Sequence, residues 1–234
     1  MARRSEEKLH RLQNNKNDWD NISPDKLNRW QRVAKASRGI LTIGNTITIA
    51  STALVINGLA DFANGQKMSG LLKVMGGRAG DLADGAAADA TGTKGRIGRD
   101  LDPSVDAIQL LAAAPVLEHA GYLPLAPAVA MIGSKGLDIA GSLAARSRGR
   151  ELNPAEEGKL GAFALWGGIG CFMLKGALDR HLPGAVDTAL EIAGWTGTVG
   201  GTIYKLPATA EYLRGGFGIT PTEIPTTNPA EIES

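Results

Sequence analysis

Four aspartates in residues 81–106 are the side chains best suited to chemistry. Asp81 and Asp84 are three residues apart, Asp102 and Asp106 are four apart, and a glycine-rich segment separates the two pairs. On a helix, residues at either spacing share a face, so each pair would project two carboxylates in one direction. If the glycine-rich segment turns the chain back, two antiparallel helices present four carboxylates to a single volume.

Four carboxylates held close together require a cation. Without one, they would repel each other by several kcal/mol in a low-dielectric setting. Carboxylates offer only oxygen ligands, which hard divalent ions prefer. The sequence therefore predicts a site for Mg²⁺ or Mn²⁺.

The same stretch resembles the signature of the CDP-alcohol phosphatidyltransferases, D-x2-D-G-x2-A-R-x8-G-x3-D-x3-D. Every gap has the family's length, and the matching residues are Asp81, Asp84, Gly85, Ala88, Gly98, Asp102 and Asp106. Seven matches in fixed register would occur by chance on the order of 10⁻⁸ of the time. One position departs from the signature, because Asp89 stands where the family has arginine. Lys94, Arg96 or Arg99 would then have to supply the missing positive charge.

The resemblance implies an enzyme of phospholipid biosynthesis, which transfers the phosphatidyl group from CDP-diacylglycerol to the hydroxyl of a small alcohol and releases CMP. By the family pattern, Asp81, Asp84 and Asp102 hold metal, and Asp106 binds metal and serves as general base. Two Mg²⁺ or Mn²⁺ ions would stabilise the attacking and leaving oxygens. The residues expected to leave room for the CDP moiety are Gly85, Ala88 and Gly98.

The acceptor alcohol is predicted from a basic segment farther along the chain. Arg146, Arg148, Arg150 and Lys159 suit the phosphate of a phosphorylated polyol, such as glycerol 3-phosphate or inositol phosphate. The Gly158-Lys159 pair also resembles a family feature. The same basic residues serve equally well as anchors on the cytoplasmic side of a membrane. A serine acceptor therefore stays open.

Composition favours a membrane bundle. The 234 residues fit one domain, and a net charge of +1 gives no reason to expect a nucleic-acid partner. A single cysteine excludes an intramolecular disulfide and a thiolate metal cluster. The 31 glycines would weaken helices in water, whereas small residues are favoured where membrane helices meet.

Residues 1–38 are predicted to form a basic cytoplasmic segment, with ten Lys or Arg against five Asp or Glu and no signal-peptide pattern. Ser23-Pro24-Asp25 would start a helix whose apolar face includes Trp30 and Val33 and whose opposite face is basic. Such a helix is typical of an anionic membrane surface. A helix packed on a soluble core is the alternative.

Residues 39–60 carry no charge and are long enough to cross a hydrocarbon core of roughly 30 Å. Five more spans are expected: from about residue 66 into the signature, on either side of Pro124, over 160–174 and over 185–204. The expected fold is therefore all-α, an integral membrane bundle of six transmembrane helices with an N-terminal amphipathic interfacial helix. Its domains would be the segment 1–38, a catalytic bundle over 39–206 and a tail over 207–234, disordered from residue 221.

Three further expectations follow from this layout. Ala193, Gly197 and Gly201 have the small-x3-small spacing of close helix contacts, within the bundle or across a homodimer. Lys73 and Arg78 precede the first aspartates, and ionisable groups at membrane depth indicate function. With a cytoplasmic N-terminus, the signature and the basic loop 146–159 both face the cytoplasm, in what we expect to be a bacterial cytoplasmic membrane.

Two other functions remain open at this level. Asp89 could make the protein a weak or inactive family member, in which case replacing it with arginine would create activity. Alternatively, the chain could be a non-enzymatic membrane protein whose aspartates bind an ion or a partner. Metal-independent behaviour and no nucleotide binding would favour this second alternative.

Overall fold

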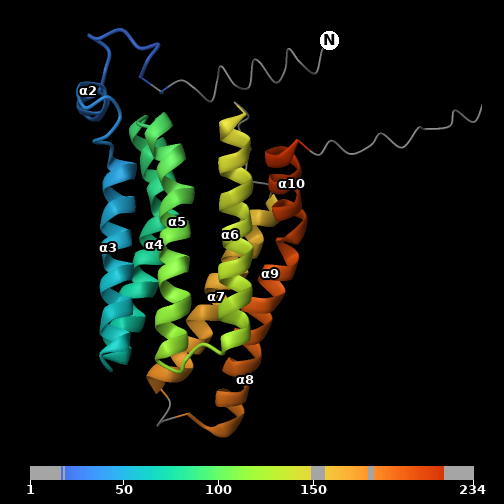
Figure 1. The fold of residues 1–234 in the computed structure, drawn as a ribbon. Coiled ribbons are helices and arrows are strands. Elements are labelled where there is room, and N and C mark those ends of the chain that lie inside the picture. Colours follow the sequence, from blue (N-terminus) through green and yellow to red (C-terminus); the bar gives the residue numbers. More distant parts are fainter. Residues whose placement is uncertain (1–16, 18, 149–155, 179–181, 219–234) are drawn as a thin grey trace, which may run out of the picture.

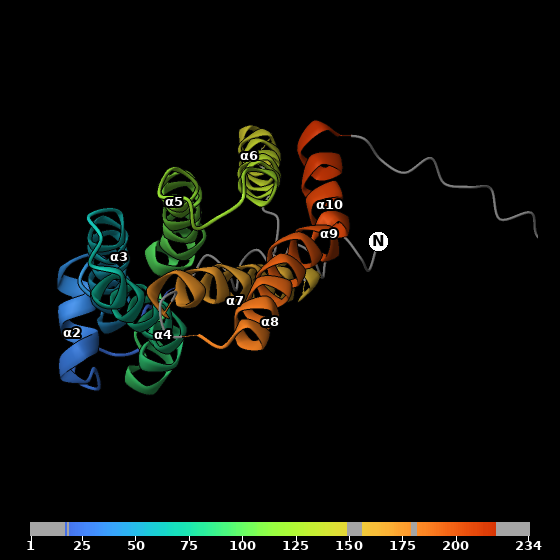
Figure 2. The ribbon, with the colours of Figure 1, turned by 90° about the horizontal axis from the view of Figure 1, so that it is seen from below.

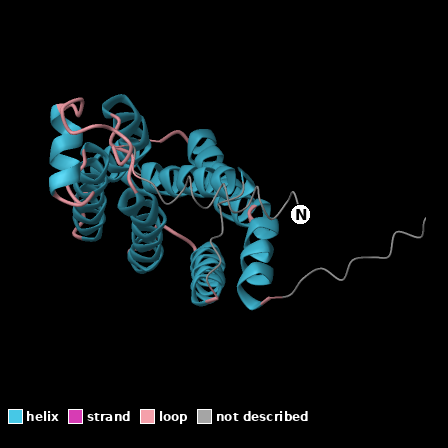
Figure 3. Cartoon of the chain, turned by 90° about the horizontal axis from the view of Figure 1, so that it is seen from above, coloured by secondary structure: helices cyan, strands magenta, loops and turns pink. Residues whose placement is uncertain are grey.

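The computed structural model describes residues 17, 19–148, 156–178 and 182–218, which form helices joined by short loops, without a strand among them (Figure 1, Figure 3). The all-α prediction is therefore confirmed for this part of the chain. The helices are α2 (Arg29–Ala36), α3 (Ile43–Ala63), α4 (Lys67–Thr91), α5 (Arg96–His119), α6 (Leu125–Ser147), α7 (Glu156–Leu178), α8 (Gly184–Trp195), the π-helical η1 (Thr196–Gly200), α9 (Gly201–Tyr204) and α10 (Leu206–Phe217).

Six long helical runs, α3, α4, α5, α6, α7 and α8 through α10, alternate in direction within the described residues (Figure 1). Seen along the bundle, α3, α5, α6 and α10 lie on one side, while α4, α7 and α8 lie on the other (Figure 2). α7 is central, since it packs against α4 and also against the last run. The connection between α4 and α5 lies at the same end of the bundle as α2 and the end of α6 (Figure 1).

Two of the described helices are long and apolar enough to cross a membrane. They cover Ile43–Ala63 and Gly158–Leu178, each with a mean hydropathy of 1.4. The other long runs carry more charged residues or are interrupted. Hydropathy therefore identifies two of the six expected spans.

Glycines bring α3 and α4 into direct backbone contact. A Cβ atom added to Gly58 would lie 2.8 Å from the carbonyl oxygen of Gly70, and one added to Gly77 would lie 2.7 Å from that of Ser51. No side chain larger than hydrogen fits these positions without a shift. This contact fixes the helix that carries the first aspartate pair against α3.

The last helical run packs on α7 through glycines in the same way. A Cβ atom on Gly197 would lie 2.7 Å from the Cα of Gly168, and one on Gly201 would lie 2.7 Å from the carbonyl oxygen of Gly161. The predicted close helix contact is confirmed at these two positions, and it lies within the chain. Ala193 is exposed and takes no part in this contact. The homodimer remains a prediction, now without support from this motif.

The N-terminal helix begins later than the sequence suggested. Residues 24–26 form a turn, and α2 begins at Arg29. The Asn28 side chain accepts a hydrogen bond from the Gln31 backbone N–H, and the Gln31 side chain accepts one from the Asn28 N–H. This reciprocal cap explains the start. α2 lies across the bundle axis, since it is seen end-on in Figure 1 and lengthwise in Figure 2.

Two predicted boundaries are also corrected. α3 begins at Ile43 rather than residue 39, because Arg38 and Gly39 have φ values of 54° and 84°. The helical domain continues beyond residue 206, because α10 packs against α6. Asp138 on α6 accepts hydrogen bonds from Lys205 and Thr209, which secures this contact. The predicted disorder from residue 221 lies outside the described residues.

Candidate active site

The two aspartate pairs lie on two antiparallel helices. Asp81 and Asp84 are on α4, whereas Asp102 and Asp106 are on α5. Gly92 ends α4 in a left-handed conformation with a φ of 60°, which a glycine adopts without strain. The turn predicted for the glycine-rich segment is therefore confirmed.

Arg78 joins the two pairs. Its Nη1 lies 2.8 Å from Asp81 Oδ2, and its Nη2 lies 3.3 Å from Asp106 Oδ1. The guanidinium also stacks on the ring of Trp166, 4.5 Å from its centre. One arginine thus bridges a carboxylate of α4 and a carboxylate of α5 beside α7.

Asp106 has three partners among the described side chains. Besides Arg78, it contacts Lys135 of α6, whose Nζ lies 3.0 Å from Oδ2. The indole N–H of Trp166 donates to Oδ1 at 3.2 Å. The Asp106 side chain is 22% exposed. Three helices besides its own therefore hold this carboxylate in place and compensate its charge.

Gln109 extends the network to α3. Its Oε1 accepts a hydrogen bond from Arg78 Nη1 at 2.8 Å, and its amide nitrogen donates to Thr52 Oγ1 at 3.1 Å. Gln109 is fully buried. These bonds add α5 and, through Thr52, α3 to the contacts that position the Arg78 guanidinium.

The other two aspartates lie near this network. Asp84 is 6% exposed, and its Oδ2 accepts a hydrogen bond of 2.6 Å from Thr48 Oγ1. Asp102 is exposed at the first turns of α5 and lies within electrostatic range of Asp81 and Asp84. Asp81 is likewise within range of Asp84 and Asp106. The four carboxylates therefore belong to one region of the bundle.

The donor chemistry of this region fits a hard divalent cation, since four carboxylates supply only oxygen. Their spacing is wider than expected, because no three Asp, Glu, His or Cys side chains of the described residues form a metal-binding group. Oxygens of three of the aspartates are instead occupied by contacts with Arg78, Lys135 and Thr48. Closer approach of the carboxylates would require these contacts to rearrange.

The residues predicted to face the CDP moiety differ in their surroundings. No neighbouring part of the described chain comes within 4 Å of a Cβ added to Gly85, so its face of α4 is open there. Ala88 packs instead against Gly44 of α3, and Gly98 lies against Asn45, whose Oδ1 would be 2.8 Å from an added Cβ. Gly85 thus faces open space, whereas Ala88 and Gly98 lie in helix contacts, and the role of all three toward the CDP moiety stays a prediction.

Asp89, at the position of the family's arginine, is exposed and pairs with Lys94 at 2.6 Å. Lys94 is one of the residues expected to replace the missing positive charge. It forms an ion pair with the aspartate that stands at the position of the family's arginine. The side chains of Arg96 and Arg99 lie outside what the structure describes.

The end of α6, with Arg146 and Arg148, and the start of α7, with Lys159, lie at the same end of the bundle as the α4–α5 connection (Figure 1). Arg148 and Lys159 are exposed. Arg150 and the side chain of Arg146 are not among the described parts of the chain. Their role as phosphate ligands remains a prediction.

Sequence reasoning did not identify several members of the network. Gln109 could have been found, because it lies three residues after Asp106 and shares its helix face. Lys135 is a lone cation in an apolar run, which marks an ionisable group with a partner inside a membrane bundle. Trp166 carries no local signal, because only the packing of α7 brings it to the aspartates. Thr48 does stand out as a polar residue in an uncharged span, where a hydrogen bond to a neighbouring helix was the expectation, and it bonds to Asp84 of α4.

Comparison with known proteins agrees with the geometry. A family model described as CDP-alcohol phosphatidyltransferase matches residues 41–200, which include all four aspartates and most of the helical runs. No curated protein and no solved structure matches the chain. The family match covers well over half of the chain, and we conclude that the protein belongs to the CDP-alcohol phosphatidyltransferase family.

Proposed function

We propose that the protein is a metal-dependent enzyme of phospholipid biosynthesis that transfers a phosphatidyl group from CDP-diacylglycerol to a small phosphorylated polyol. Membership of a transferase family supports this proposal. The observation that carries it is the Arg78 bridge between Asp81 and Asp106, because it unites the two halves of the signature in one charged network.

In the proposed reaction, the acceptor hydroxyl attacks the β-phosphorus of CDP-diacylglycerol. A new phosphorus–oxygen bond forms, the anhydride bond breaks, and CMP leaves with the bonding electrons. Asp106 takes the proton of the hydroxyl. Lys135, Arg78 and the Trp166 N–H stabilise its ionised form and orient its oxygens.

Asp81, Asp84, Asp102 and Asp106 would hold Mg²⁺ or Mn²⁺, as two ions in the family's manner. The divalent charge would neutralise the pyrophosphate of the donor and stabilise the leaving oxygen. Thr48 orients Asp84 through its hydrogen bond, as a supporting residue does around metal ligands.

We further propose that all six long runs span the membrane, with the α4–α5 connection facing the cytoplasm. Two of the runs are long and apolar enough by themselves to cross a membrane. Several charged residues of the others are paired inside the bundle, as Arg78 is with Asp106 and Lys205 with Asp138. Paired charges that face the protein lower the cost of placing such helices in lipid.

The acceptor is inferred from the cations around Asp106. Lys135 is 14% exposed and directly contacts the proposed base, so an acceptor phosphate beside it would place a hydroxyl near Asp106. Free inositol and serine lack a phosphate for this lysine. Arg148 and Lys159, being exposed, would attract the anionic acceptor toward the site.

The test is CMP release from CDP-diacylglycerol by the purified protein in detergent with Mg²⁺, offering glycerol 3-phosphate, inositol phosphate, free inositol and serine separately. We expect release with one phosphorylated acceptor. Lys135→Gln should raise the KM for that acceptor, while Lys175→Gln, which changes a lysine paired with Asp187 and Glu191, should not. Release with free inositol or serine alone would overturn the acceptor assignment.

The exposed Asp89–Lys94 pair favours one second candidate, an inactive family member. Under that hypothesis, Asp89→Arg creates activity that the native protein lacks. Our proposal expects native activity and no such gain. Assaying both proteins with the same acceptors distinguishes the two functions.

A further inference from the structure

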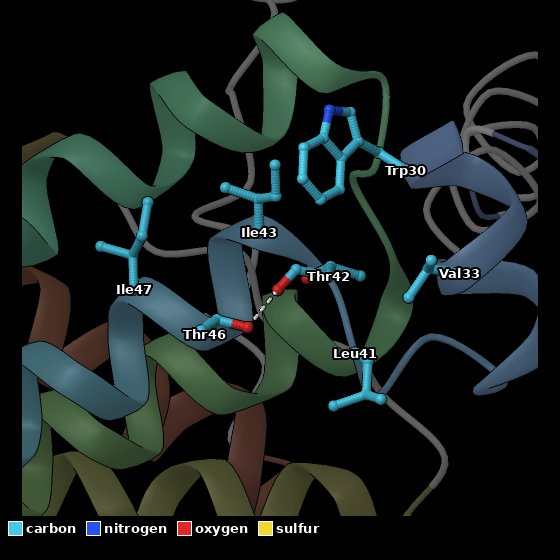
Figure 4. Close-up of a pocket in the computed structure, with 7 residues that line it drawn as sticks. All are labelled: Trp30, Val33, Leu41, Thr42, Ile43, Thr46 and Ile47. Atoms are coloured by element: carbon cyan, nitrogen blue, oxygen red, sulfur yellow. Dashed lines mark hydrogen bonds between the residues drawn. The ribbon is translucent and has the colours of Figure 1, made fainter. Parts of the chain in front are cut away.

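An apolar groove lies between α2 and the start of α3 (Figure 4). Its volume is about 240 Å³. Its apolar lining residues are Trp30, Val33, Leu41, Ile43 and Ile47. Thr42 and Thr46 complete the wall, but the Thr46 hydroxyl donates to the Thr42 carbonyl and Thr42 caps α3. The groove therefore offers little polar chemistry to a ligand.

The surface of α2 is divided into three faces. Gln31 and Ala34 are buried against the protein, whereas Trp30 and Val33 are exposed to the groove by 39% and 46%. The basic residues of α2, Arg29, Arg32 and Lys35, occupy the remaining face, and no acid lies on this helix. The Arg29 guanidinium lies over the Trp30 ring, 4.6 Å from its centre, at the border between the apolar and basic faces.

We propose that this groove binds one acyl chain of an anionic phospholipid whose headgroup phosphate lies on Arg29 and Lys35. The apolar lining suits a hydrocarbon chain, and the adjoining cationic face suits a negative headgroup. α2 lies across the bundle axis at the end of α3, so chain and headgroup would have the orientation of a bilayer lipid (Figure 1). This site is separate from the signature aspartates and goes beyond the proposed transfer reaction.

The proposed lipid would lie next to hydrogen bonds that connect α2 to the helix carrying the first aspartate pair. The Asn28 side chain donates to the carbonyl oxygen of Thr91 at 3.0 Å, and that of Gln31 donates to the carbonyl oxygen of Gly92 at 3.1 Å. Both acceptors are at the end of α4, where it turns into α5. A lipid that steadies α2 therefore acts next to the connection between the two aspartate pairs.

The test uses the full chain in phosphatidylcholine nanodiscs that contain a minor fraction of phosphatidylglycerol. Bromine on an acyl chain quenches the fluorescence of a tryptophan that it touches. The quenching due to Trp30 is the quenching in the native protein minus the quenching in Trp30→Phe. We expect brominated phosphatidylglycerol to quench Trp30 several-fold more than the same amount of brominated phosphatidylcholine. Equal quenching by both lipids would overturn the proposal, because it means contact with bulk lipid only.

Two variants separate the headgroup from the chain. Arg29→Gln with Lys35→Gln should abolish the preference for phosphatidylglycerol, while Lys175→Gln at the opposite end of the bundle should keep it. Thr46→Phe, which fills the groove, should lower the quenching of Trp30 by either lipid. If the double variant keeps the preference for phosphatidylglycerol, the assignment to lipid is overturned. A second test uses Val33→Cys in a Cys171→Ser background. A disulfide between two copies of this variant would mean that another copy of the chain, and not a lipid, occupies the groove.

Discussion

Arg78 of α4 lies 3.3 Å from Asp106 of α5, and this ion pair is where the two halves of the signature meet. The same guanidinium binds Asp81 and stacks on Trp166, so three helices depend on one cation. In the proposed enzyme, Arg78 positions the base and one metal-binding carboxylate relative to each other.

Arg78→Gln should destabilise the protein, because it leaves Asp81 without its cation. Breaking a buried ion pair by removing one partner costs on the order of 3–5 kcal/mol, and the partial exposure of this pair places its cost at or below the lower end. Mg²⁺ should recover part of this loss, since the freed carboxylates can bind it. Melting temperatures of the native protein and the variant, in EDTA and in Mg²⁺, provide the measurement. The same loss in both conditions would contradict a shared role of these aspartates in metal binding.

Trp166→Phe should keep the ring beneath Arg78 but remove the hydrogen bond to Asp106. A bond to a charged group contributes about 1.5–3 kcal/mol, so kcat should fall roughly tenfold or more. Trp195→Phe is the control, because Trp195 packs on Phe172 away from the aspartates. An unchanged kcat in Trp166→Phe would mean that the indole N–H does not position the base.

Thr48→Val should weaken metal binding, because the isosteric side chain cannot donate to Asp84. Losing a bond that orients a metal ligand costs about tenfold or more in affinity. The Mg²⁺ concentration for half-maximal CMP release should therefore rise by that factor. Thr46→Val serves as the control, since Thr46 bonds only to the backbone of α3. Equal Mg²⁺ requirements in the native protein and Thr48→Val would exclude the proposed role of Thr48.

The signature allowed a correct prediction of which helices carry the aspartates, because helix periodicity and the glycine turn are local properties. Their surroundings were not predictable, since Trp166 and Lys135 reach Asp106 only through the packing of α7 and α6. The predicted start of α2 at Ser23-Pro24 was wrong, because Asn28 and Gln31 form a reciprocal cap that begins the helix at Arg29. The role assigned to Gly98 was incomplete, because its contact with Asn45 depends on how α5 lies against α3.

The glycine contact between α7 and the last run gives a stability prediction. Gly197→Ala places a Cβ 2.7 Å from the carbonyl oxygen of Ala164, so it should cost about 1–3 kcal/mol as an overpacked contact. Gly200→Ala is the matched control, because its added Cβ meets nothing closer than 4.0 Å. Thermal unfolding in detergent compares the two. A similar effect of both substitutions would contradict the packing described for this run.

The most direct test of the account is Mg²⁺-dependent CMP release by the native protein, Asp106→Asn and Asp187→Asn. Asp187 is paired with Lys175 at the other end of the bundle and controls for the loss of a carboxylate. We predict release by the native protein and Asp187→Asn in Mg²⁺, none in EDTA, and none by Asp106→Asn. Activity that survives in Asp106→Asn, or that needs no divalent ion, would contradict the central claim that the aspartates of α4 and α5 form a metal-dependent active site.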